Sequence, residues 1–192
     1  MPDSITSIKD SAFYYCENLT NIVIGNNVTN IESRAFYGCS SLITNIVIPN
    51  GTSSIGDSTF GNCYRLTHVT IPSSVKSIDD HAFHGCFKLT TVNISNNSNM
   101  TSIKAYAFNS CNKLTNITIP NTVTNIGDSA FHYCRSFTDI TIPYSVINIG
   151  RWAFKECNEL TLTFENRTQA DIDAMDNKYW GLNANQCVPG IK

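Results

Sequence analysis

The order of hydrophobic and polar positions repeats along this chain with a period of about 23 residues. The segment from Ile117 to Cys134 is one complete copy: alternating β-branched residues come first, Pro120 follows, and Ala-Phe-x-x-Cys closes the unit. The phenylalanine of this unit recurs at intervals of 23 to 25 residues, at Phe13, Phe36, Phe60, Phe83, Phe108, Phe131 and Phe154. Such self-similarity predicts a repeat solenoid, in which each unit packs only on its neighbours. We call one unit a rung.

Each rung is expected to contain two short extended segments. The motif Leu-Thr-x-Ile-x-Ile alternates and is rich in β-branched residues, which is typical of a strand. These first strands are expected at 19–24, 44–48, 66–71, 89–94, 114–119, 137–142 and 160–164. A proline, which has no N–H to give to a neighbouring strand, ends four of them, at Pro49, Pro72, Pro120 and Pro143. Second segments are expected at 28–31, 75–78, 123–126 and 146–149, with Thr52 and Met100 replacing valine in other rungs.

The rest of the rung is expected to be a turn that closes the core. Asp57 and Asp128 are suited to cap a short helical turn that holds Ala-Phe-x-x-Cys, and the phenylalanines should form one column of buried rings. A period of 20 to 29 residues with a leucine and isoleucine skeleton is typical of leucine-rich repeats. The expected fold class is therefore an α/β repeat solenoid, a leucine-rich-repeat superhelix of about seven 23-residue repeats with parallel strands and short helical turns.

Seven of the eight cysteines occupy one position of the repeat. Equivalent side chains on stacked rungs project in parallel, which is poor geometry for a disulfide. We therefore expect buried thiols that pack as small apolar groups, with disulfides or metal binding as the alternative. Cys187 lies outside this series, and the sequence leaves open whether it is free or paired.

The two ends of the chain depart from the repeat. Residues 1–164 are expected to form the solenoid, with an incomplete first repeat, and residues 165–192 a C-terminal helical cap. Thr168 and Asp171 have capping-box spacing for a helix reaching about Asn177, with Ile172 and Met175 on one face. No polar cap covers the first rung, so we expect either a fragment of a longer protein or an open end that packs on a partner, including a homodimer.

Composition narrows the classes of function. The net charge is −2 and only 15% of the 192 residues are charged, so no electrostatic signal for nucleic acid or an anionic membrane is expected. No apolar run approaches the ~20 residues of a membrane helix, and the first residues lack the features of a signal peptide. Membrane insertion is therefore not expected.

Candidate catalytic chemistry is sparse. Asp79, Asp80, His81, His84 and Cys86 form the only metal-like cluster, but Cys86 should point into the core, so a solvated turn is favoured over a metal site. A His68–Asp139 dyad is excluded because three strand spacings separate the pair by about 14 Å. With no phosphate loop and no serine nucleophile motif, we expect no enzyme and no cofactor.

The most informative surface is the outward face of the first strands, which should be flat, nearly uncharged and rich in Asn and Thr. Its members are Asn21, Val23, Asn45, Val47, His68, Thr70, Thr91, Asn93, Asn116, Thr118, Asp139 and Thr141. We call these twelve residues the strand face. Solenoids use such faces for extended recognition, which favours a protein-binding module. The alternatives are a passive spacer, and a threonine array that binds glycan, ice or another repetitive surface. Ice is disfavoured because the rows mix Asn, Val, His and Asp with Thr.

The repeat motif, clearest from Cys111 to Cys134, resembles the BspA-like (treponeme-type) leucine-rich repeat over residues 2–164. The tail from Ala174 to Gly181 is similar to the segment that closes many bacterial members. The resemblance implies a non-catalytic, adhesin-like protein at the cell surface or secreted, whose partner is a host matrix or cell-surface protein. The chain departs from the family in its missing N-terminal cap and in Thr59, which replaces alanine.

Overall fold

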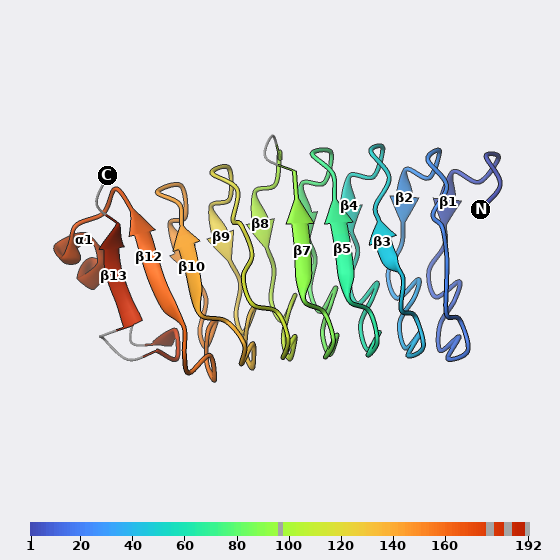
Figure 1. Cartoon of the computed structure of the whole chain (residues 1–192). Helices are drawn as coiled ribbons and strands as arrows, with labels where there is room; N and C mark the ends of the chain where they lie inside the picture. The colour runs from blue at the N-terminus through green and yellow to red at the C-terminus, as the bar shows by residue number, and fades with distance from the viewer. Residues whose placement is uncertain (96–97, 176–178, 183–185, 191–192) are drawn as a thin grey trace.

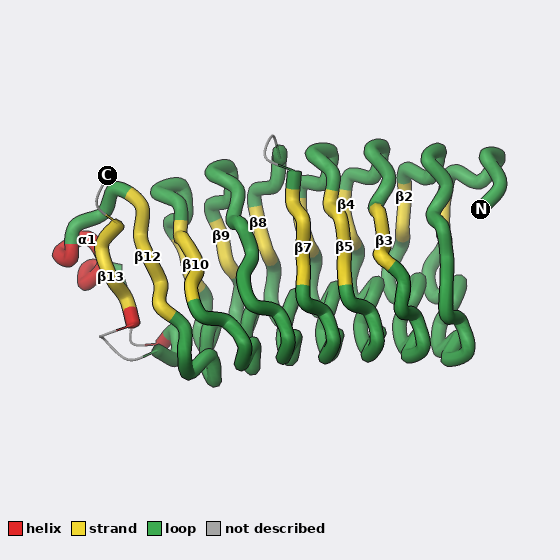
Figure 2. The backbone as a smooth tube through the Cα atoms, viewed as in Figure 1, coloured by secondary structure: helices red, strands yellow, loops and turns green. Residues whose placement is uncertain are grey.

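The computed structural model of this chain describes residues 1–95, 98–175, 179–182 and 186–190. The rungs lie side by side in one elongated array, with the two termini at opposite ends (Figure 1). Two columns of short strands run along the array, and turns make up most of the remaining backbone (Figure 2). The predicted solenoid of parallel strands is confirmed.

The first column contains two groups of three parallel strands. One group is β3 (Asn45–Val47), β5 (His68–Ile71) and β7 (Thr91–Ile94); the other is β10 (Asp139–Ile142), β12 (Thr161–Glu165) and β13 (Cys187–Gly190). Equivalent residues of successive rungs face each other, as in the pairs Val69–Val92 and Ile71–Ile94. Because the register follows the repeat, each core position forms a continuous row along the solenoid.

The second column matches the predicted second segments. Its strands are β1 (Ser7–Ile8), β2 (Asn30–Ile31), β4 (Ser54–Ile55), β6 (Ser77–Ile78), β8 (Ser102–Ile103), β9 (Asn125–Ile126) and β11 (Asn148–Ile149). Strands β1 and β2 form one pair, and β4, β6, β8, β9 and β11 form a five-stranded parallel sheet in chain order. Thr52 and Met100, which replace the valine of other rungs, are both fully buried beside this column. The column therefore accommodates different side chains at the valine position.

Two predicted first strands are not strands. Residues 19–24 and 114–119 are extended, but they belong to neither of the two three-stranded groups of the first column. Within the described residues, no backbone hydrogen bond joins residues 115–119 to a neighbouring rung. The second interruption is local, because β8 and Phe108, which precede residues 114–119, keep their register with β6 and Phe83. At the first interruption one backbone bond between rungs remains, from the Ile43 N–H to the Thr20 carbonyl (3.1 Å).

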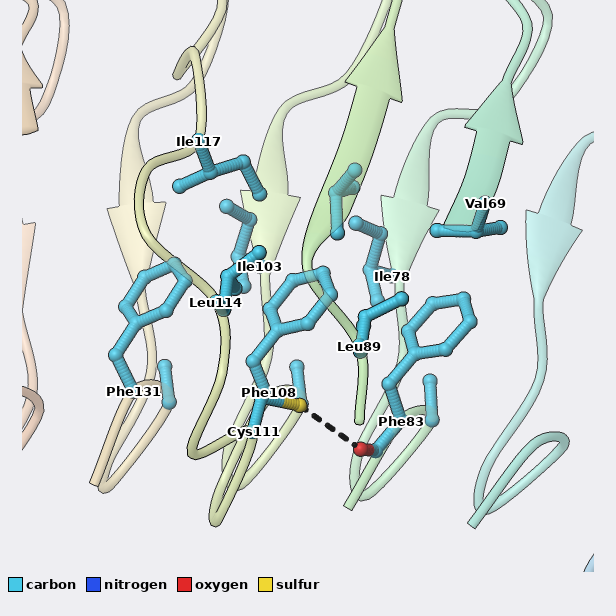
Figure 3. Packing of buried hydrophobic residues seen from close by; sticks show 14 of the residues in the cluster. Val69, Ile78, Phe83, Leu89, Ile103, Phe108, Cys111, Leu114, Ile117 and Phe131 are labelled. Atoms are coloured by element: carbon cyan, nitrogen blue, oxygen red, sulfur yellow. Dashed lines mark hydrogen bonds between the residues drawn. The ribbon is translucent and has the colours of Figure 1, made fainter. Parts of the chain in front are cut away.

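The phenylalanine column is confirmed as the centre of the core. Neighbouring rings stack almost parallel, as between Phe83 and Phe108, whose centroids are 5.3 Å apart with planes inclined by 3°. Figure 3 shows these two rings in a row with Phe131, beneath the aliphatic residues of both strand columns. Phe131 continues the stack to Phe154 with a centroid separation of 5.5 Å. Offset aromatic stacking adds to the hydrophobic free energy of these buried rings.

The predicted helical turns are wrong. Among the described residues the segments around Ala-Phe-x-x-Cys are successive tight turns, and residues with positive φ precede both the alanine and the cysteine, for example Tyr106 (56°) and Ser110 (63°). A left-handed residue interrupts a helix. The turns instead pair across rungs: the Phe108 N–H donates to the Ala130 carbonyl at 2.8 Å.

The turn aspartates do not cap helices as predicted. The Asp128 carboxylate accepts the N–H of Arg151 in the next rung at 2.7 Å, and Asp80 accepts the N–H of Ala105 at 2.9 Å. These carboxylates therefore satisfy backbone donors of the following rung, and no helix of their own follows them.

The C-terminal segment contains helix α1 (Gln169–Ala174), which begins with the predicted Thr168–Asp171 capping box. The helix ends at Ala174; the predicted end near Asn177 lies outside the described residues. Ile172 is buried and Met175 partly buried, in agreement with the predicted apolar face. Strand β13, which pairs with β12, was not predicted; it begins at Cys187, whose thiol is free and buried.

Candidate binding face

All twelve residues of the strand face point away from the core, as predicted. Each is exposed except Thr70 and Thr91, which are half-buried. Val23 and Val47 are the most exposed apolar members, at 70% and 55% of their surface. Where strands pair, the register places Asn45 beside His68 and His68 beside Thr91. Within this group of strands the side chains of successive rungs therefore lie side by side.

One hollow on the strand face lies where the first column is interrupted. It has a volume of about 570 Å³ and is lined by Asn116, Thr118, Asp139 and Thr141 of the strand face, together with Glu165. The unpaired segment 115–119 forms one wall, and β10 forms the other. The interruption therefore gives an otherwise flat face a recess lined by amide, hydroxyl and carboxylate groups.

A second hollow of about 290 Å³ lies at the proline end of β3, β5 and β7, where Val47, Thr70 and Asn93 line it. Two polar members of the strand face are held by their sequence neighbours: His68 Nδ1 lies 2.9 Å from the Thr67 hydroxyl, and Thr138 donates to Asp139 at 2.9 Å. Asp139 is the one acidic member of the strand face and no member is Lys or Arg, so the face carries little charge.

The metal-like cluster is dispersed over different contacts. Asp79 forms an ion pair with Lys104 at 2.8 Å. The His81 ring stacks on the Tyr106 ring with centroids 4.8 Å apart, and the Cys86 thiol donates a hydrogen bond to the Phe60 carbonyl in the core. No group of three His, Cys, Asp or Glu side chains within the described ranges is placed to hold a metal ion. These residues form a turn with structural contacts.

Six cysteines of the repeat are buried as predicted, and all eight are free thiols. Cys16 is the exception, because it is exposed in the first rung. Burial raises the pKa of the Cys39 thiol to about 11 and that of Cys86 to about 12. Such thiols stay protonated at neutral pH and are poor nucleophiles and poor metal ligands.

A hollow that the sequence analysis missed lies beside the strand face. Its volume is about 520 Å³ and its lining contains three cations, Arg65, Lys88 and Lys113. Each of them follows a repeat cysteine by two positions, in three consecutive rungs. Comparing variable positions rung by rung would have found them, whereas the net charge of −2 conceals them.

The described part of the chain contains no helix that is both long and apolar enough to cross a membrane. The sequence analysis did not expect a membrane helix on the basis of hydrophobicity alone, whereas this observation concerns the helices that the fold contains.

Several solved bacterial structures are similar to this chain. A leucine-rich repeat protein from Eubacterium ventriosum has 31% identity and a TM-score of 0.74, covering 81% of this chain and 41% of its own. A leucine-rich cell surface protein from Faecalibacterium prausnitzii has 29% identity and a TM-score of 0.68, covering 91% and 55%. The T. pallidum leucine-rich repeat protein has 29% identity and a TM-score of 0.63, covering 76% and 67%. This chain thus spans about half the length of two of these relatives.

A search of curated proteins found no match. The family model described as the BspA type leucine rich repeat region, in contrast, matches in six copies over residues 1–111 and 101–174. Together these ranges include the turns, the phenylalanine column and helix α1. Proteins of such families are generally protein-binding scaffolds without a catalytic site. The chain belongs to the BspA-type leucine-rich-repeat family.

Proposed function

We propose that this chain is a non-catalytic recognition module of a surface protein, and that it binds a protein ligand on the strand face in adhesion. The observation that carries the proposal is the continuous exposure of twelve weakly charged side chains over successive rungs, with a recess at Asn116 and Thr118. A rigid face of this kind loses little conformational entropy on binding, which favours recognition of an extended partner surface.

The proposed location is the cell surface or the secreted space, and the proposed partner is a host matrix or cell-surface protein. Support comes from the Faecalibacterium prausnitzii relative, which is described as a cell surface protein. This chain spans only part of that relative, so a surface role for the whole protein is also a proposal.

The chemistry of the face supports a protein ligand. Asn and Thr side chains offer both donors and acceptors, while Val23 and Val47 add exposed apolar area at one end. Protein interfaces combine such apolar contacts with direct hydrogen bonds. The recess at Asn116 can receive a protruding side chain, which would fix the register of the partner along the solenoid.

The test is binding of the purified chain to matrix proteins and whole cells, compared with a variant in which Thr70, Asn93 and Thr118 are changed together to Lys. The three sites lie on successive rungs of the strand face. The matched control changes Thr29, Thr101 and Thr124 to Lys, since these exposed residues precede the second strand column. We expect binding to be lost in the strand-face variant only.

The main alternative is a passive spacer that projects another domain. A well-folded chain that binds none of the proteins or cells would support the spacer and contradict the recognition module. Equal binding by the strand-face variant and the control variant would place the contact elsewhere on the solenoid. Neutral glycans belong in the same assay because the repeated Thr and Asn rows offer hydroxyl and amide partners to a repetitive ligand.

We also propose that two copies can pair through the first rung. Phe13, Leu19 and Ile22 are only partly buried there, whereas their equivalents in inner rungs are also covered by the preceding rung. Pairing of two such ends about a two-fold axis would bury these side chains. Sedimentation velocity over a dilution series tests this idea, and a Phe13→Ser variant should shift any dimer to monomer. A monomer at every concentration would reject it.

A further inference from the structure

Three cations form a row at one end of the first strand column. Arg65, Lys88 and Lys113 are exposed and line one hollow with Ile43, Thr67 and Thr90. Rungs stack at ~4.8 Å, so the row presents one positive charge per strand spacing over three rungs. We call these three residues the cationic row.

The cationic row has no acidic neighbour in its hollow. The ion pairs found in the described residues use Lys9, Lys104 and His81, and none uses a member of the row. The three like charges lie in turns of adjacent rungs and repel one another. The same position is Ser41 in the rung before the row and Ser136 in the rung after it, so the repeat does not require a cation there. The repulsion is therefore a local feature that a bound anion would offset.

Two exposed aromatic residues adjoin the row in sequence. Tyr64 and Phe87 immediately precede Arg65 and Lys88, and their rings stack with centroids 5.1 Å apart and planes inclined by 5°. Both rings are 41% exposed. Their exposed edges and outer faces can contact the apolar C–H groups of a sugar, while the adjacent cations take its acidic substituents.

We propose that the cationic row binds an acidic glycan, a linear polysaccharide that carries sulfate or carboxylate groups on successive sugars. A sugar residue of an extended polysaccharide advances by close to one strand spacing, ~4.8 Å, so successive acidic groups meet successive rungs. Ile43 lines the hollow together with the row, and the long aliphatic stems of Arg and Lys allow their charged heads to reach solvent. The site is separate from the contact proposed for a protein ligand.

The geometry favours a glycan over nucleic acid. Along one strand of duplex DNA a charge recurs every ~3.4 Å of helix axis, which does not match one cation per rung. A single-stranded nucleic acid would be held by stacking of its bases on aromatic rings. Tyr64 and Phe87 stack on each other, so a base could stack only on their outer faces. Binding of single-stranded DNA is therefore one of the outcomes that the test distinguishes.

The experiment measures binding of the full chain to a heparin-derived octasaccharide by calorimetry at several salt concentrations. A Lys88→Gln/Lys113→Gln variant removes two charges of the row, and an Arg34→Gln/Lys76→Gln variant removes two exposed charges elsewhere. We expect the row variant to weaken binding at least about tenfold and to lower the slope of log affinity against log salt by about 1 to 2. The control variant should leave both quantities unchanged.

Thermal unfolding of the same variants keeps the test decisive. Substitutions at exposed turn positions should leave the melting temperature of the row variant close to that of the parent chain, so lost binding cannot be ascribed to misfolding. Equal binding of single-stranded DNA or polyglutamate would overturn the glycan assignment in favour of a general polyanion site. Absence of octasaccharide binding at low salt would overturn the site itself. Neither result bears on the strand-face variant, whose protein ligand is assayed separately.

Discussion

The thiol of Cys111 donates a hydrogen bond to the carbonyl oxygen of Phe83 in the preceding rung, at 3.3 Å (Figure 3). The same carbonyl also accepts the N–H of Cys86 at 3.2 Å. The contact recurs along the solenoid, with Cys donors and Phe acceptors at Cys39–Phe13, Cys63–Phe36, Cys86–Phe60, Cys134–Phe108 and Cys157–Phe131. Cysteine therefore joins successive rungs, and it does so while packing as a small apolar group.

Replacing Cys111 by Ala should lower the free energy of unfolding by about 1 to 3 kcal/mol, because the change removes a buried contact and leaves a small void. Urea denaturation monitored by circular dichroism measures the effect. The matched control is Cys16→Ala at the exposed copy of the same repeat position, which should change stability by less than about 0.5 kcal/mol. Equal costs at the two sites would contradict a role for the inter-rung thiol bond.

The thiols should differ in reactivity as they differ in burial. Burial raises the pKa of Cys111 and Cys134 well above its usual value, while Cys16 is exposed. Labelling of the native chain with a maleimide at neutral pH should therefore modify Cys16 first, and the buried thiols only after unfolding. Peptide mass spectrometry locates the label. Rapid modification of Cys111 in the folded chain would show that the rungs open locally.

Much of the fold is predictable because each rung repeats the same local solution. The phenylalanine column, the second strand column and the outward direction of the strand face follow from positions that every rung shares. The predicted helical turn was wrong because alternate N–H groups of the turn donate to the next rung, as from Phe108 to Ala130. A period alone does not distinguish those bonds from bonds within one turn.

The candidate sites show a different limit. The exposure of Asn116 and Thr118 was predictable, but their recess depends on the unpaired segment 115–119, which no local pattern indicates. The cationic row was missed because overall charge averages over the surface, whereas Lys88 and Lys113 become neighbours only when rungs stack. Features produced by stacking thus require the register of the repeat as well as its motif.

Substituting Phe131 by Ala should cost about 3 to 5 kcal/mol, since its ring is fully buried between Phe108 and Phe154. The loss interrupts the aromatic column and leaves a cavity that neighbouring rungs cannot fill. Phe87→Ala is the control, because Phe87 is 41% exposed and stacks only at the surface. Urea midpoints of the two variants should differ clearly. A similar, small effect for both would mean that the column adds little to stability.

The folded chain should lose stability as the pH falls through the usual histidine pKa of about 6.5. Burial lowers the pKa of His84, as does the neighbouring His81 charge; burial also lowers that of His132, with Lys155 adding to the effect. The neutral imidazole is therefore favoured in the fold, and below the unfolded pKa the unfolded chain binds more protons. Within the described residues, His84 Nδ1 and His132 Nε2 are buried without a hydrogen-bond partner, which makes an added proton costly there.

Melting temperatures measured between about pH 7.5 and pH 5 test this expectation in the range where histidine titrates. A His84→Asn/His132→Asn variant should show a smaller decrease than the parent chain, whereas His68→Asn, at an exposed position, should show the parent's decrease. Carboxylates do not confuse the comparison, because the lowered pKa values of Glu32 and Asp171 move their loss of stability to more acidic pH. An identical pH dependence in all three proteins would show that the two half-buried histidines are protonated as readily in the folded state as in the unfolded state.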